Sequence, residues 1–214
     1  MPRLNILKSW KAFMLVIVGL PLAAYGIVRL AEQKYAPLPW YGENFEDMHR
    51  PEKAFRLQHF AFTSAGNLPV DSEDWKGRIT VAHLFFTSCP TICPVMMEQM
   101  QKIQDSGADI NLVSVTVDPG HDTPQKLQAY IRQKGYGQGN WQLLTGDKRE
   151  LYRFARKGLF ITATEGDGGP EDFIHSDRLV LLDSLQYIRG YYSGTSEKEV
   201  RLLLDDIKKL QHER

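Results

Sequence analysis

Residues 79–94 read ITVAHLFFTSCPTICP, and this stretch decides the fold. Its first half, Ile79–Phe86, is a nearly continuous apolar run of strand length, which is typical of a strand buried on both faces of a sheet. The run leads directly to Cys89 and Cys93, so both cysteines follow the carboxyl end of the predicted strand. Ligand and active sites of open α/β sheets gather at that end. We therefore expect an α/β domain whose chemistry lies at the two cysteines.

Predicted strands and helices alternate along the rest of the domain. A second apolar run, Asn111–Val117, predicts another buried strand. Thr123 can cap a helix that starts at Pro124, because proline suits the first helical position, and Gly135 can end it. The other predicted elements are a hairpin around Gly66-Asn67, helices at 95–104, 147–155 and 197–210, a strand at 141–144, and a late hairpin at 179–182 and 188–192. This order predicts a mixed sheet with helices on both faces, and we expect an α/β, thioredoxin-like fold.

The amino-terminal region contains an uncharged apolar run, Ala12–Val28. A helix needs roughly 17–25 apolar residues to cross a bilayer, so the run is long enough to do so. Arg3, Lys8 and Lys11 precede it, and the positive-inside rule then places the amino terminus in the cytoplasm. We expect an uncleaved transmembrane anchor rather than a cleaved signal peptide, whose apolar core is shorter. The expected organisation is a cytoplasmic amino terminus at 1–11, an anchor at 12–30, a linker at 31–52 and a domain at 53–214.

Charge and composition limit which partners and which cellular location we expect. The chain has 26 basic and 26 acidic residues, so no net charge draws it to nucleic acid. No hydrolytic or phosphate-binding motif is visible, and we do not expect an enzyme. The short basic amino terminus, without a long transit peptide, favours the bacterial inner membrane, with the domain facing the periplasm or the outside.

The sequence has only two cysteines, and their Cys-x-x-x-Cys spacing is compatible with more than one chemistry. Two soft thiolates suit Cu(I), whereas a structural zinc site would need four ligands. Thiol–disulfide exchange of the thioredoxin type uses a spacing that is one residue shorter. A structural disulfide would close so small a loop that it would restrict the unfolded chain little. The spacing alone leaves copper binding and thiol redox chemistry equally open.

The histidines add candidates for a third ligand. His59 and His83 lie in strand-like runs, where a hydrogen-bonded structural histidine is the favoured interpretation. His121 lies in a loop that also leaves the carboxyl end of a predicted strand, so it could approach the cysteines. His175 stands between a polar loop and a strand, and a mobile loop could bring it to the cysteines. By chemistry alone His175 is the stronger candidate, and His121 remains an alternative.

Four elements resemble, in order, the motifs of the SCO/SenC family. Residues 85–94, FFTSCPTICP, look like its copper-binding loop, and residues 118–124, DPGHDTP, are similar to its Asp-Pro-x-x-Asp-Thr-Pro stretch. Residues 141–146, WQLLTG, resemble its Trp-x-x-Leu-Thr-Gly element. His175-Ser176, followed by a strand, resembles the histidine that precedes its late strand. The match covers about residues 55–210 and is specific, because the four elements occur in the family's order with sensible gaps.

The resemblance implies a thioredoxin-like fold and a site for one copper ion, as Cu(I) or Cu(II). It implies Cys89, Cys93 and His175 as the ligands, with Asp118 behind them orienting the site. It also implies delivery of copper to, or maturation of, the dinuclear copper centre of a haem-copper cytochrome oxidase, with the copper-bearing subunit as acceptor and an upstream protein as donor. Oxidation of the Cys89–Cys93 pair to a disulfide would abolish copper binding, so we expect metal occupancy and thiol redox state to be coupled.

Two alternative functions remain open, and the sequence departs from the family's motifs at two places. The alternatives are a thiol–disulfide oxidoreductase, which would reduce the copper-ligand cysteines of the oxidase subunit, and a redox or copper sensor. The family often has a basic residue where His121 stands, and the helix after the cysteines is richer in methionine than usual. The thioether of Met96 or Met97 could hand copper on, but burial in the core is the favoured interpretation of both side chains.

Overall fold

The computed structural model describes residues 10, 13–42, 52, 54–161 and 176–213. The chain divides into two compact units, Met1–Pro37 and Leu38–Arg214. The boundary between them falls inside the segment that the sequence predicts as a linker.

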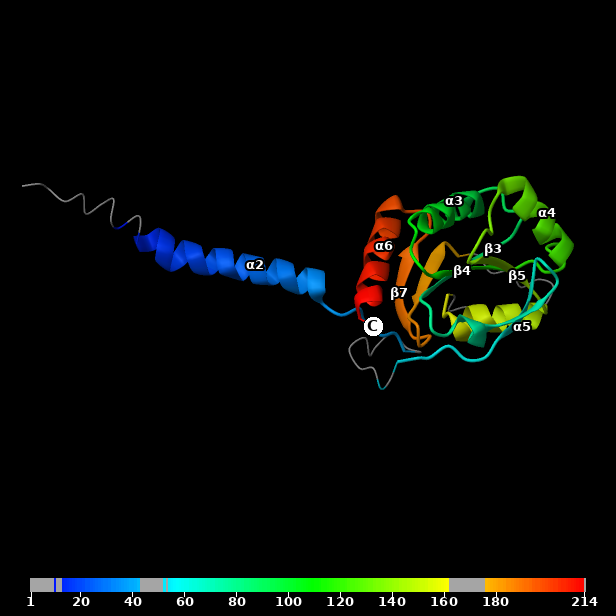
Figure 1. The fold of residues 1–214 in the computed structure, drawn as a ribbon, viewed down its shortest axis with the longest axis horizontal. Helices are drawn as coiled ribbons and strands as arrows, with labels where there is room; N and C mark the ends of the chain where they lie inside the picture. Colours follow the sequence, from blue (N-terminus) through cyan, green and yellow to red (C-terminus); the bar gives the residue numbers. More distant parts are fainter. Residues whose placement is uncertain (1–9, 11–12, 43–51, 53, 162–175, 214) are drawn as a thin grey trace, which may run out of the picture. The chain divides into compact units, whose positions relative to one another are not determined.

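The amino-terminal unit is helical. A π-helical stretch, η1 (Leu15–Gly19), continues into the α-helix α2 (Leu20–Tyr35), which is drawn in blue in Figure 1. Large apolar side chains of this unit are exposed, among them Leu15, Leu20 and Ile27. None of the described helices combines the length and the apolar character that a membrane crossing requires. The transmembrane anchor predicted at 12–30 is therefore not supported by the described helices.

The second unit is built on a sheet of seven strands in the described residues, in the order β2-β1-β5-β4-β3-β6-β7. The strands are β1 (Ala61–Ser64), β2 (Pro69–Asp71), β3 (Thr80–Phe85), β4 (Asn111–Thr116), β5 (Trp141–Thr145), β6 (Arg178–Leu182) and β7 (Ile188–Ser193). The central strands β3, β4 and β5 are parallel, whereas β6, β7, β1 and β2 pair antiparallel with their neighbours. The mixed sheet that the sequence predicts is thus confirmed.

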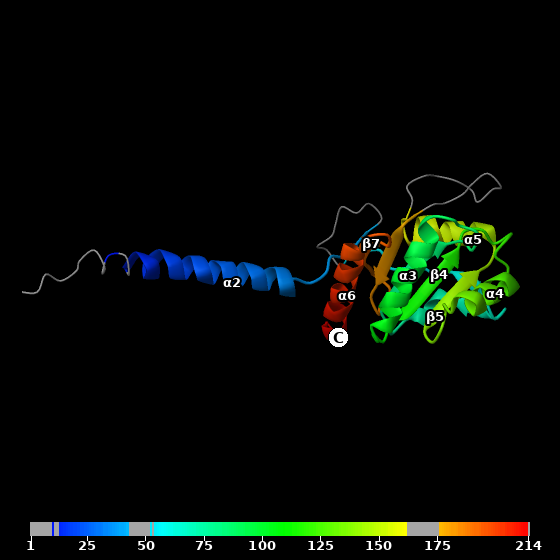
Figure 2. The same cartoon turned by 90° about the horizontal axis from the view of Figure 1, so that it is seen from above.

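Helices cover both faces of this sheet. The helices are α3 (Ile92–Asp105), α4 (Pro124–Lys134), α5 (Lys148–Arg153) with its π-helical continuation η4 (Phe154–Gly158), and α6 (Glu197–His212), and a 3-10 turn, η3 (Ser72–Trp75), follows β2. The helices α3 and α6 lie side by side on one face, and α5 lies on the other (Figure 1 and Figure 2). One apolar cluster joins α3, α4 and α6 to the sheet, and a second joins η3 and η4 to the opposite face. All six residues of β3 are buried because side chains from both of its faces enter these two clusters.

Two local predictions about helix ends are tested by the structure. Thr123 caps α4, its hydroxyl accepting a hydrogen bond from the Lys126 amide, and Gly135 ends that helix in the left-handed conformation with φ of 76°. Both were expected from the sequence and are confirmed. The predicted start of α3 at residue 95 is wrong, because the helix begins at Ile92. Pro94 fits inside the first turn, where its missing amide hydrogen has no partner to lose.

Candidate metal centre

The two cysteines lie where β3 passes into α3, at the carboxyl edge of the parallel strands. Cys89 follows a short turn after Phe85, and Cys93 lies in the first turn of α3. Both are free thiols and both are buried, with 8% and 4% of their surfaces exposed. The Cys93 amide donates a hydrogen bond to the Cys89 sulfur at 3.5 Å, and the Thr91 hydroxyl lies 3.9 Å from the same sulfur. The two cysteines that the sequence singled out are therefore brought together.

The two thiols differ in acidity. Burial alone would raise the pKa of Cys89, but hydrogen bonds from Cys93 and Thr91 outweigh it and lower that pKa below its usual value. At Cys93 burial dominates, and the hydrogen bond to Cys89 adds to it, so its pKa rises to about 12. Cys89 is consequently the first of the pair to become a thiolate. A metal that binds both sulfurs must also displace the proton of Cys93, which makes its affinity dependent on pH.

A buried carboxylate, Asp122, fixes the turn that precedes Cys89. Asp122 has no exposed surface, and its carboxylate accepts hydrogen bonds from the Thr87 amide at 3.0 Å and the Thr116 hydroxyl at 2.6 Å. It also bonds to the Thr87 hydroxyl and lies 3.1 Å from Nδ1 of His121. Asp122 thereby ties the end of β4 to the segment leading into Cys89. The sequence reasoning missed this residue, although it stands directly before the Thr123 cap in the DPGHDTP stretch.

Asp118, which the resemblance implies as the residue that orients the site, begins the same loop. Its amide donates to the Thr116 hydroxyl at 3.0 Å, and its carbonyl accepts from the amides of His121 and Asp122. Within the described part of the chain, no hydrogen bond or ion pair reaches its side-chain carboxylate. The predicted role of Asp118 at the metal thus stays a prediction.

Two of the other candidate histidines have clear surroundings. His83 is fully buried in β3, and its Nε2 lies 2.6 Å from the Ser114 hydroxyl. Burial lowers its pKa to about 4, so the ring is neutral, and its interpretation as a structural histidine is confirmed. His121 is about half exposed and lies against Asp122 and Thr87, 3.5 Å from the hydroxyl of the latter. Its ring thus contacts Asp122 in its own loop and Thr87 in the turn after β3.

Met96 and Met97 lie in the core and have no exposed surface. Met97 contacts the Ser114 hydroxyl at 4.0 Å, and both side chains belong to the cluster between α3 and the sheet. Their interpretation as core residues is confirmed. Neither thioether is exposed at the surface, where it could hand copper on to a partner.

His175, the predicted third ligand, lies outside the described residues. Just beyond it, the Asp177 carbonyl accepts a hydrogen bond from the Gly194 amide at 2.6 Å. A methyl group added to Gly194 would lie 3.1 Å from Cε of Met96, so Gly194, which follows β7 and bonds to Asp177, packs close to the first turns of α3. In the described part of the chain, no group of three or more His, Cys, Asp or Glu side chains is gathered as a metal site.

Comparisons with known proteins identify relatives along most of the domain. The SCO1/SenC family model matches residues 49–212. The chain is 27% identical to the SCO1 protein homolog of Bacillus subtilis over 159 residues, which are 72% of this chain and 82% of that protein. It is 33% identical over 130 residues to a protein of Stutzerimonas stutzeri named as a candidate copper-binding protein, covering 58% of this chain and 62% of that one.

Solved structures give the same result for the fold. A SCO1/SenC family lipoprotein from Bacillus anthracis matches with a TM-score of 0.65 and 29% identity, over 82% of this chain and 98% of that structure. A second match is BsSco, which is described as a member of the Sco family of cytochrome c oxidase assembly proteins with a disulfide switch. It matches with a TM-score of 0.62 and 25% identity, over 75% of this chain and 95% of that structure. The predicted α/β, thioredoxin-like fold is confirmed by these matches, and the chain belongs to the SCO1/SenC family.

Proposed function

We propose that this chain binds one copper ion through Cys89, Cys93 and His175 and assists assembly of the dinuclear copper centre of cytochrome c oxidase. The observation that carries the proposal is the pair of reduced, buried thiols joined by an amide-to-sulfur hydrogen bond of 3.5 Å at the carboxyl edge of the sheet. Thiolates are the soft ligands that Cu(I) prefers. The relative named as a candidate copper-binding protein and the oxidase assembly proteins of the Sco family support the same assignment.

The third ligand is proposed from the packing around β6. Asp177 lies two residues after His175 in sequence, and it bonds to Gly194, which packs near Met96 on the helix that begins at the cysteines. Two thiolates and one neutral imidazole would hold copper and leave a coordination position for a ligand of the acceptor protein. Copper is cargo in this scheme, and the chain binds and transfers it rather than catalysing a reaction.

Copper stoichiometry tests this proposal. The reduced full chain is loaded with copper, dialysed and analysed for metal, beside Cys89→Ser, Cys93→Ser and His175→Ala. We expect about one copper per wild-type chain and a loss in all three variants, because two ligands hold copper far less tightly than three. His121→Ala is the matched control, since that ring lies against Asp122 and Thr87, and it should keep its copper. Unchanged stoichiometry in all three ligand variants would refute the site.

A second function, reduction of disulfides in the oxidase copper subunit, is favoured by the unequal acidity of the thiols. A lowered pKa at Cys89 beside a raised one at Cys93 is what thiol exchange needs, with one nucleophile and one resolving thiol. His175→Ala separates the two functions. It should abolish copper retention but leave the rate at which the reduced chain reduces a peptide disulfide nearly unchanged. Loss of both copper retention and disulfide reduction would show that His175 is needed for both functions.

We also propose a membrane-associated location at the bacterial inner membrane, with the domain facing the periplasm. The exposed apolar side chains of η1 and α2 support it, because such surfaces are unusual on a monomer in water. Cell fractionation tests the association, and protease treatment of intact spheroplasts tests the side. Recovery of the chain in the soluble periplasmic fraction would contradict the proposal.

A further inference from the structure

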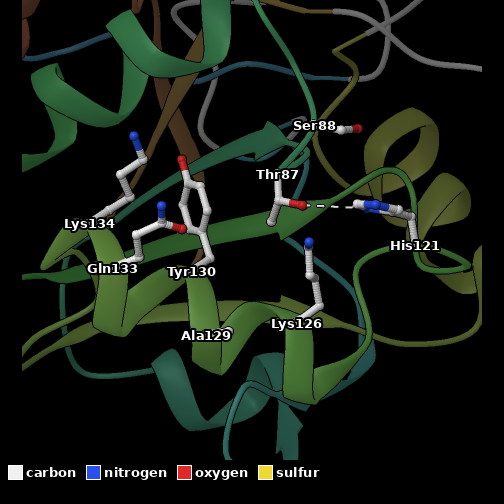
Figure 3. Close-up of a pocket in the computed structure, with 8 residues that line it drawn as sticks. All are labelled: Thr87, Ser88, His121, Lys126, Ala129, Tyr130, Gln133 and Lys134. Atoms are coloured by element: carbon white, nitrogen blue, oxygen red, sulfur yellow. Dashed lines mark hydrogen bonds between the residues drawn. The ribbon is translucent and has the colours of Figure 1, made fainter.

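A surface pocket of about 310 Å³ adjoins the cysteine turn (Figure 3). One wall is formed by Thr87 and Ser88, the residues that lead into Cys89, and by His121. The other wall is the exposed side of α4, including Lys126 and Lys134. A protein that approaches the two thiols from the side of α4 would therefore lie on this pocket.

The wall formed by α4 is positively charged and follows helical spacing. Lys126, Tyr130 and Lys134 are four residues apart, which places them on one face of the helix, and Figure 3 shows their side chains leaving α4 on the same side. No acidic residue is among those that line the pocket. Asp122 lies behind His121, but its carboxylate is buried and already bonded to Thr87 and Thr116.

The two lysines of the pocket differ from the three ion-paired lysines elsewhere on the domain. Lys76, Lys208 and Lys209 each pair with a carboxylate three residues earlier in the sequence. Lys126 and Lys134 have no ion pair to any described residue. Two uncompensated ammonium groups thus face one small hollow beside the thiols.

Tyr130 adds a hydrogen-bond donor to the same hollow. Its ring lies between Phe85 and Tyr136, at centroid distances of 6.2 and 6.1 Å, which fixes the direction of the hydroxyl. Among the described residues the hydroxyl has no hydrogen-bond partner. Half-buried phenols usually find one, so this group is available to an external acceptor.

We propose that this pocket binds carboxylate side chains of the partner protein that exchanges copper or electrons at Cys89 and Cys93. Carboxylates complement two ammonium groups and a phenol donor, because they accept hydrogen bonds and carry the opposite charge. A protein partner is favoured over a free anion, because the pocket continues into Ser88 and hence into the thiol turn. The inference deepens the proposed function, and charge complementarity of this kind mainly raises association rate and fixes orientation.

The test uses the full-length, reduced, metal-free chain in non-ionic detergent. Two fluorescent peptides of equal length and sequence serve as probes, one with three glutamates and one with three glutamines in their place. We expect the glutamate peptide to bind about tenfold more tightly at low salt, and the difference to shrink as salt screens the charges. The double variant Lys126→Gln/Lys134→Gln should lose this preference.

The matched control removes the same charge elsewhere. Lys102→Gln/Lys208→Gln changes an exposed lysine of α3 and one of α6, neither of which lines the pocket, and should retain the preference. Lysine acetylation followed by mass spectrometry gives the location, since the bound glutamate peptide should protect Lys126 and Lys134 but not Lys102. Equal binding of the two peptides, or equal loss in both double variants, would overturn the proposal. Competition by millimolar phosphate as effective as the peptide itself would also overturn it, by assigning a free-anion site.

Copper stoichiometry separates this inference from the proposed function. Lys126→Gln/Lys134→Gln should still retain about one copper per chain, because neither lysine is a ligand. If the wild-type chain failed to retain copper while the glutamate peptide still protected Lys126 and Lys134, copper binding would be refuted and the docking pocket would stand.

Discussion

The cysteine turn and the surroundings of Arg189 differ in whether their polar groups are paired within the protein. Arg189, in β7, is buried, and its guanidinium donates to the carbonyls of Leu38 and Pro39, to Asp183 at 3.2 Å and to Glu213 at 3.1 Å. Its charge also stacks on Trp40, 4.2 Å from the ring centroid. At the cysteine turn the thiols are free, and the ammonium groups of Lys126 and Lys134 pair with no described residue. Arg189 is fully paired within the domain, which fits a structural role. The thiols and the two lysines are open to a ligand, which fits the proposed copper site and docking pocket.

The Arg189 cluster also explains how the start and the end of the domain are held. Leu38 and Pro39 are the first residues of the second unit, and Glu213 is close to its end. Both bond to one side chain in the sheet, and Asp183 supplies the compensating charge. The hydrogen bonds of Arg189 thus join both ends of the domain to β7. Their loss should lower the stability of the domain and leave copper binding unchanged.

The largest expected effect follows from Arg189→Met. Removing one member of a buried ion pair leaves Asp183 uncompensated, and we expect the free energy of unfolding to fall by about 3–5 kcal/mol. Urea denaturation of the reduced chain measures it. Arg78→Met is the matched control, because Arg78 forms an exposed pair with Asp109 that should contribute no more than about 1 kcal/mol. A folded Arg189→Met chain should retain its copper, and similar stability losses in the two variants would contradict the distinction between the regions.

Asp122→Asn is expected to lower both the stability of the domain and its affinity for copper. An amide has one acceptor oxygen in place of two, so bonds to Thr87 or Thr116 are lost, and the free energy of unfolding should fall by about 2 kcal/mol. Copper affinity should fall roughly 10–100-fold, because the turn before Cys89 loosens. Denaturation and a competition titration with a Cu(I) chelator measure the two effects.

Asp118→Asn is the control for Asp122→Asn. Its carboxylate bonds to no described residue, so stability should change by less than about 0.5 kcal/mol. A fall in copper affinity without a fall in stability would support the role that the resemblance implies for Asp118. An equal stability loss in both variants would show that Asp122 has no special part in holding the turn.

The unequal acidity of the thiols predicts a pH-dependent selectivity in alkylation. Only the thiolate reacts with iodoacetamide, so Cys89, whose pKa is lowered, should react first. Cys93, whose pKa is raised to about 12, should lag by about tenfold or more near pH 8. The difference should narrow as the pH rises toward 12, because Cys93 then loses its proton. Peptide mapping by mass spectrometry measures the ratio, and faster reaction at Cys93 would reverse the assignment of nucleophile.

The sequence predicted what depends on short-range pattern. The buried run of β3, the cysteines after it and the Thr123 cap are all readable within a few residues, and each was confirmed. The bond from Asp122 to Thr87 spans 35 residues, and that from Arg189 to Leu38 spans 151, so no local signal reveals either. The helix start at Ile92 was missed because Pro94 suggested a loop, although proline is tolerated in a first turn.

The smallest expected effect comes from a pair of tyrosines. Tyr130→Phe removes a hydroxyl that bonds to no described residue, so the free energy of unfolding should change by less than about 0.5 kcal/mol. Tyr192→Phe removes a hydroxyl that donates to Asp206 at 2.8 Å, and should cost about 1 kcal/mol. Both substitutions keep the ring, so denaturation of the two variants compares a satisfied hydroxyl with an open one. Tyr130→Phe should instead weaken binding of the glutamate peptide, because its phenol is the donor that the pocket offers. A stability loss at Tyr130 equal to that at Tyr192 would mean that the Tyr130 hydroxyl already has a partner in the protein, and the pocket would then lose one of its three binding groups.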